Sequence, residues 1–267
     1  VQTCALPIFK SIEKILELYY TLLLFITELA HDDLLDTEDL QRKYFPKDEE
    51  VHAKNRLHAV KFIAVLEKSD VFRSKLKEYH CSWQNDQDLV RKIFLELKKS
   101  DEYKKFMVTD GADEKEILLQ IVRIFMEKSE AMQSALQERS IYWGEDLSFC
   151  SHLIIKTIKE FYERNKLEFP ALYKDEKDDK KFVKLLFEKT ILNNASLETS
   201  ISAKTKNWDV ERIAMMDILL MKMALAEMMT FESIPVKVSI NEYIDISKEY
   251  STPRSKLFIN GIIDKLA

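Results

Sequence analysis

Cysteine and histidine are the residues of this 267-residue chain that could act as nucleophiles or bind a transition metal. The three cysteines, Cys4, Cys81 and Cys150, lie far apart and are odd in number. Zinc-binding cysteines come in closely spaced pairs and a disulfide framework needs an even number, so the pattern fits neither. The histidines also lack the spacing of a ligand set or a catalytic triad: His31, His52, His58, His80 and His152. We therefore expect no metal, no cofactor and no enzymatic activity, and the unpaired cysteines indicate a reducing cytoplasm.

Glycine-rich loops that hold phosphates or nucleotide cofactors are also missing from the sequence. The three glycines, Gly111, Gly144 and Gly261, are isolated, and no strand–turn–helix pattern surrounds them. The chain has only five prolines, while 46% of its residues are hydrophobic and 33% are charged. Sheet-rich folds need many tight turns, so this composition predicts an all-α fold of helices joined by short polar links.

The overall charge bears on the partners that the chain could bind. The formal net charge is −5, whereas proteins that bind nucleic acid by overall charge are usually basic. Any nucleic-acid role therefore needs a local basic patch or a basic partner. The most apolar stretch, residues 15–30, contains Glu17 and Glu28 and is shorter than the roughly 20 apolar residues of a membrane span. We interpret it as a buried core helix and expect no membrane association.

The first eight residues, 1–8, read VQTCALPI and do not begin with methionine. They are similar to an in-frame translation of a widely used sequencing-library adapter, and we expect them to be an artefact rather than a genuine apolar tail. On this interpretation the protein's own N-terminus is missing.

Apolar residues with helical spacing predict helices along most of the remaining chain. The first runs from Phe9 to about Ala30, is followed by a polar break over residues 31–39, and cannot continue past Pro46. Several helices are expected between residues 50 and 140, and further ones over 149–164 and 182–192.

The last sixty residues carry unusually clear helix signals. Asn207, Trp208 and Asp209 supply cap-type side chains before a long apolar helix over residues 213–228. Ser239 and Glu242 have the spacing of a capping box, which predicts a helix start at Ser239. A last helix is predicted to start at Thr252-Pro253, with the proline in its first turn.

Together these residues resemble the NusB family of transcription antitermination factors. The resemblance rests on five motifs at the family's spacings: Asn207-Trp208-x-x-x-Arg212, Asp217 through Ala224-x-x-Glu227, Ile234-Pro235-Val236-Lys237-Val238, Asn241-Glu242, and Phe258-Ile259-Asn260-Gly261-x-x-Asp264. It implies a NusB-like helical bundle with an additional inserted helical region. Residues 9–45 would then form a helix of the N-terminal half, 46–145 the insertion and 146–267 the C-terminal core.

The resemblance also implies a function. Proteins of this family bind a single-stranded RNA element, boxA, in ribosomal RNA transcripts together with the ribosomal protein NusE, within the RNA polymerase antitermination complex. A basic partner would explain how a mildly acidic chain can join an RNA complex. The family's arginine-rich first helix has no counterpart here, which we expect if the true start is missing.

The family's site positions can be matched to individual residues of this chain. Asp217, near Arg212, stands at the acidic position that faces the ribosomal partner, with an exposed helix carboxylate as the alternative interpretation. Phe258 stands at the RNA-contacting aromatic position, and simple core packing is its alternative. Arg254 and Lys256 are expected to meet phosphates, with Ser255 as a neutral donor, or else to form a solvated turn. Better-known members often carry an acidic residue where Arg254 stands.

Three further interpretations remain at this point. Gly261 lies inside a helical stripe and is expected to permit close helix packing. The chain could instead be a NusB-like domain detached from an RNA cytosine methyltransferase, although it lacks a cofactor loop. It could also be a helical protein-binding scaffold that has lost RNA binding.

Overall fold

The computed structural model describes residues 6–42, 53–144, 146–205 and 213–266. Within these ranges every regular element is helical and no strand occurs, which confirms the predicted all-α class. The chain divides into two compact units, Pro7–Leu172 and Tyr173–Ala267. None of the described helices combines the length and the apolarity that crossing a membrane requires. The division into family halves at residues 45 and 146 stays a prediction.

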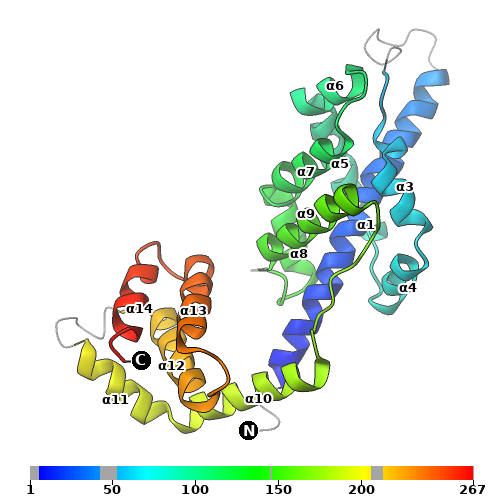
Figure 1. Cartoon of the computed structure of the whole chain (residues 1–267). Coiled ribbons are helices and arrows are strands. Elements are labelled where there is room, and N and C mark those ends of the chain that lie inside the picture. Colours follow the sequence, from blue (N-terminus) through cyan, green and yellow to red (C-terminus); the bar gives the residue numbers. More distant parts are fainter. Residues whose placement is uncertain (1–5, 43–52, 145, 206–212, 267) are drawn as a thin grey trace. The chain divides into compact units, whose positions relative to one another are not determined.

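The N-terminal unit is built around one long helix, α1 (Leu6–Arg42). In Figure 1 this helix runs the length of the unit, with α3 and α4 on one side and the later helices on the other. The elements that follow it are η2 (Leu57–Ala59), α3 (Lys61–Lys68), α4 (Asp70–Glu78), η3 (Gln84–Asp86), α5 (Gln87–Lys99), α6 (Asp101–Val108), α7 (Glu114–Gln120), η4 (Ile121–Met126), α8 (Glu130–Arg139) and α9 (Leu147–Arg164).

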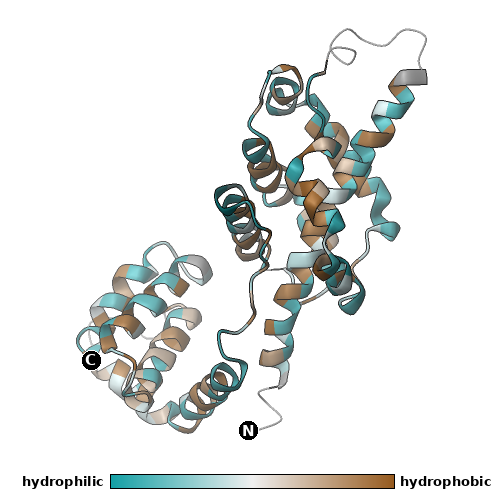
Figure 2. Ribbon diagram, turned by 45° about the vertical axis from the view of Figure 1, so that its right-hand side comes forward, coloured by the Kyte–Doolittle hydropathy of each residue, from teal (hydrophilic) through white to brown (hydrophobic). Residues whose placement is uncertain are grey.

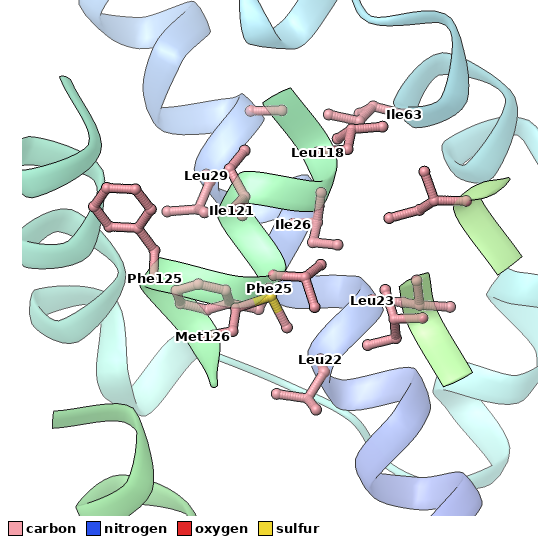
Figure 3. Close-up of a cluster of buried hydrophobic side chains, with 14 of the residues drawn as sticks. Leu22, Leu23, Phe25, Ile26, Leu29, Ile63, Leu118, Ile121, Phe125 and Met126 are labelled. Atoms are coloured by element: carbon pink, nitrogen blue, oxygen red, sulfur yellow. The ribbon is translucent and has the colours of Figure 1, made fainter. Parts of the chain in front are cut away.

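The core of this unit forms where α1 meets α3, α7 and the π-helical turn η4. Figure 3 shows side chains from these elements packed together, among them Leu22, Ile26, Ile63, Leu118 and Met126. All five are at most 1% exposed, so the apolar stretch of α1 is a buried core helix as predicted. Each such side chain stabilises the fold by about 1.5–3 kcal/mol through burial.

The predicted polar break over residues 31–39 is wrong, because α1 continues through it to Arg42. Its acidic side chains are bonded by residues distant in sequence. Asp33 accepts hydrogen bonds from the Tyr103 hydroxyl and from the backbone amide of His58 (3.2 Å), while Asp36 pairs with Lys98 (2.5 Å). These bonds offset the cost of placing carboxylates on a packed helix face.

The C-terminal unit consists of α10 (Glu176–Leu192), α11 (Asn194–Lys204), α12 (Met215–Thr230), α13 (Val236–Tyr250) and α14 (Ser255–Ile263). α12 packs against each of the other four, and its apolar residues are spread around the helix, as a central helix requires. Figure 2, which colours residues by hydropathy, shows apolar and hydrophilic residues mixed on the helices of this unit. The core residues of this unit include Leu220, Ala224, Tyr243 and Ile259.

Two helix starts differ from prediction. α13 begins at Val236, directly after Pro235, so Ser239 lies within the helix and forms no capping box. α14 begins at Ser255, and Thr252 and Pro253 belong to the turn before it. The predicted cap at Asn207-Trp208-Asp209 lies outside the described residues.

Candidate functional site

The candidate site is the short turn that joins α13 to α14, together with the first turn of α12 beneath it. The backbone amide of Ser251 closes α13 by donating to Ser247 (3.1 Å), and the amide of Ser255 donates to the carbonyl of Thr252 (2.9 Å). Arg254, the residue before α14, makes no side-chain cap on that helix. The turn is therefore held by side chains rather than by a standard helix cap.

Asp217 lies in the first turn of α12 and is the main side chain that holds this turn. It is only 5% exposed. Its Oδ1 accepts a hydrogen bond from the Ser251 hydroxyl (2.5 Å), and its Oδ2 accepts one from the Ser255 hydroxyl (2.8 Å). Hydrogen bonds to a charged acceptor are about twice as strong as neutral ones, so this carboxylate fastens the end of α13 and the start of α14 to α12.

The predicted RNA-contacting residues differ in exposure. Arg254 and Lys256 are exposed, whereas Phe258 is half-buried and packs partly against the core of the unit. Ser255 is 1% exposed, and its hydroxyl is directed to Asp217 rather than to solvent. The turn thus exposes two cations close in sequence to a half-buried aromatic ring, while Ser255 faces inward.

Several neighbouring residues were not predicted. Leu257 is 73% exposed beside Phe258, and its place outside the apolar stripe is the sequence signal for that exposure. Ser251, 34 residues from its partner Asp217, has no local signal at all. On α12, Met215, Met216 and Leu219 expose apolar surface (88%, 37% and 45%) next to Asp217. Arg212, the predicted companion of Asp217, lies outside the described residues.

A second buried carboxylate on α12, Glu227, has a similar arrangement away from the turn. It is 6% exposed and accepts hydrogen bonds from Ser239 (2.6 Å) and from the Tyr243 hydroxyl (2.8 Å), both on α13. Burial and the adjacent Glu227 charge raise the pKa of Tyr243 well above its usual value, so the phenol stays a donor. Glu227 thus joins α12 to α13 through two side chains of that one helix.

Gly261 does not serve close packing in this structure. A Cβ built on Gly261 would meet no atom within 4 Å, so the expected close approach of another helix is wrong. No group of three or more histidine, cysteine, aspartate or glutamate side chains in the described ranges is placed to hold a metal ion.

Comparison with known proteins finds similarity in the C-terminal part of the chain. The NusB family model matches residues 148–267. The transcription antitermination protein NusB of Salinibacter ruber is 42% identical over 85 residues, 32% of this chain and 53% of that protein. The protein of the same name from Chloroherpeton thalassium is also 42% identical over 85 residues (32% of this chain and 40% of that protein). That of Trichlorobacter lovleyi is 38% identical over 87 residues (33% and 61%).

The matched region spans 40–61% of the length of these curated relatives. No solved structure matches the chain. The family match includes α9, which packs within the N-terminal unit, and the whole of the C-terminal unit. Residues 148–267, with the site around Asp217 and Phe258, therefore carry a NusB-family domain.

Proposed function

We propose that this protein is a transcription antitermination factor that binds boxA-type RNA in ribosomal RNA transcripts together with the ribosomal protein NusE. The observation that carries the proposal is that Arg254 and Lys256 are exposed within four residues of the half-buried Phe258, inside a NusB-family domain. The name of the curated relatives, transcription antitermination protein, supports the same role.

The RNA contact proposed here combines charge and stacking. Arg254 and Lys256 would bind phosphates, since cationic side chains on an exposed turn can follow a flexible backbone. Phe258 would stack on one base, which is worth about 1–3 kcal/mol, and its partial burial keeps the ring orientation fixed. Leu257, exposed beside it, would widen the apolar surface on which a base can rest.

The partner contact is proposed at the first turns of α12. Met215, Met216 and Leu219 supply exposed apolar area, and Asp217 and Arg212 supply charge. Because Asp217 is 5% exposed, a basic side chain of the partner would reach its carboxylate only by displacing a serine hydroxyl. A basic ribosomal protein would also offset the chain's net charge of −5 against the RNA.

The protein would thus act by binding, in the cytoplasm, as part of the RNA polymerase antitermination complex and without catalysis. A domain detached from an RNA cytosine methyltransferase is not favoured, because the relatives that the chain matches are named as antitermination proteins. A scaffold without RNA binding is the competing outcome of the experiment.

The test is fluorescence anisotropy with a labelled boxA RNA and a scrambled RNA of equal length, with and without purified NusE. We expect the intact chain to prefer boxA and NusE to tighten that binding. The variant Phe258→Ala should weaken boxA binding about 5- to 150-fold if the ring stacks on one base. Lys222→Ala, on α12 and paired with Glu198 (2.8 Å) away from the turn, serves as the control. Equal affinity for boxA and scrambled RNA, or NusE binding without any RNA binding, would refute the proposal.

A further inference from the structure

The unexpected feature of the site is that a carboxylate predicted to face a partner is buried and fully bonded. Both oxygens of Asp217 accept hydrogen bonds, one from Ser251, which caps the end of α13, and the other from Ser255, the first residue of α14. A buried carboxylate is costly to desolvate and is tolerated only when its hydrogen bonds are complete. Its two bonds therefore constrain where Ser251 and Ser255 can lie.

The protons of the turn can be assigned from the geometry. Ser255 has two lone pairs and one hydroxyl proton, which it shares between Asp217 (2.8 Å) and the Ser251 hydroxyl oxygen (3.0 Å). The Thr252 amide donates to the Ser255 oxygen at 3.1 Å, so the Thr252 hydroxyl, 2.7 Å away, must supply the remaining hydrogen bond as a donor. The Ser255 hydroxyl therefore has no hydrogen-bonding capacity left, and it connects the carboxylate of Asp217 to the backbone amide of Thr252.

The residues that this network holds in place are those proposed to touch RNA. Arg254 lies between the two anchored serines, Lys256 directly follows Ser255, and Phe258 is the third residue after Ser255. None of these three side chains hydrogen-bonds to Asp217 in the structure. The carboxylate is therefore connected to these three residues through the backbone of the turn rather than by direct hydrogen bonds.

We propose that Asp217 is a positioning residue for the RNA-binding turn, acting through Ser251 and Ser255. This inference rests on the proposed function and extends it, because it gives the acidic residue a task within the chain itself. Without the two serine bonds, the turn before α14 loses its hydrogen-bonded attachment to α12. Arg254, Lys256 and Phe258 then sample several arrangements, and RNA must select the competent one.

The test compares two isosteric substitutions on the same helix. In Asp217→Asn the amide replaces one acceptor with a donor, so one serine hydroxyl loses its acceptor. Glu227→Gln makes the same change at the other buried carboxylate of α12, whose partners Ser239 and Tyr243 lie away from the turn. Both variants should lower the melting temperature, so the pair separates positioning from general stability.

The first readout is the affinity for boxA RNA. We expect Asp217→Asn to weaken binding about tenfold and Glu227→Gln to change it less than twofold. Ser255→Ala should also weaken binding about tenfold, and the two losses should not add in the double variant, since Asp217 and Ser255 belong to one hydrogen-bond network. Equal losses in Asp217→Asn and Glu227→Gln, or independent effects of Asp217→Asn and Ser255→Ala, would overturn the inference.

The second readout needs no RNA, and it separates failure of this inference from failure of the proposed function. Trypsin can cleave after Arg254 and Lys256, and cleavage requires the turn to open. We expect faster cleavage at these two sites in Asp217→Asn than in wild type, with unchanged rates in Glu227→Gln. If wild type binds no RNA, the proposed function fails while this result still decides the positioning role. Unchanged cleavage in Asp217→Asn would refute the positioning role in either case.

Discussion

Replacing Gly261 with alanine should stabilise the C-terminal unit. Gly261 lies in α14, and its backbone is helical rather than left-handed. An added Cβ would meet no atom within 4 Å, so the methyl group causes no clash. Alanine also reduces the conformational freedom of the unfolded chain, which favours the folded state.

The expected gain is about 0.5–1 kcal/mol, the usual advantage of alanine over glycine inside a helix. The lower half of this range applies, because Gly261 is two residues from the end of α14 and helix ends fray. A change of 1 kcal/mol shifts the melting temperature of a 60–100-residue domain by roughly 4–8 °C, so we expect about 2–6 °C here. Differential scanning calorimetry can follow the transition of the C-terminal unit, with urea denaturation as an isothermal check.

Gly111 provides a control of opposite sign. A Cβ there also meets no atom within 4 Å, but the backbone has φ +63°, which costs a non-glycine residue about 1–2 kcal/mol. Gly111→Ala should therefore destabilise the N-terminal unit although both sites are equally open. If Gly261→Ala instead lowers stability by more than about 0.5 kcal/mol, another helix packs closely on Gly261 and the argument from open space is refuted.

Three further predictions follow from the described contacts. Arg254→Ala and Lys256→Ala should each flatten the dependence of log affinity for RNA on log salt concentration by about 0.7, as expected for one lost phosphate contact to a single strand, and an unchanged slope would place that side chain off the RNA. Burial alone would raise the pKa of Asp36, but the hydrogen bonds and charges of Lys98 and Arg91 outweigh it and lower that pKa. The interaction of Asp36 with Lys98 and Arg91 therefore stabilises the fold above the unfolded pKa of about 3.9, and this contribution is lost as the pH falls further. In Asp36→Asn the free energy of unfolding, measured by urea denaturation, should fall less steeply below about pH 4 than in wild type. An unchanged pH dependence would contradict this. Tyr103→Phe removes a buried donor to Asp33 and should cost about 1–3 kcal/mol in urea unfolding, whereas a loss under about 0.5 kcal/mol would show that Asp33 is satisfied without it.

Local patterns in the sequence predicted most of the helices. The apolar spacing from Phe9, from Phe149 and from Ile213 corresponds to α1, α9 and α12, because helical periodicity reports directly on the buried face. The capping box at Ser239 failed for a physical reason. The serine hydroxyl is used by the buried Glu227, a bond between two helices that no local pattern reveals.

The same limit applies to the candidate site. Arg254 and Lys256 are exposed, as residues that meet phosphates must be, but Asp217 and Ser255 turn inward to each other. Their separation of 38 residues puts this bond beyond any motif. Whether Arg254, Lys256 and Phe258 contact RNA and whether Asp217 contacts a partner stay predictions.

The position of α9 has a practical consequence for dissecting the chain. This helix is the first element of the family match, yet its Thr157 bonds to Tyr19 of α1 (2.8 Å), and its Phe161 packs on Phe62 of α3 with the ring centres 5.3 Å apart. A fragment cut at residue 148 would strand these apolar groups in water and invite aggregation. A fragment for expression should instead begin after Leu172, where one hydrophobic core ends and the next begins. The start of the family match at residue 148 and the start of the compact C-terminal unit thus differ by about two dozen residues.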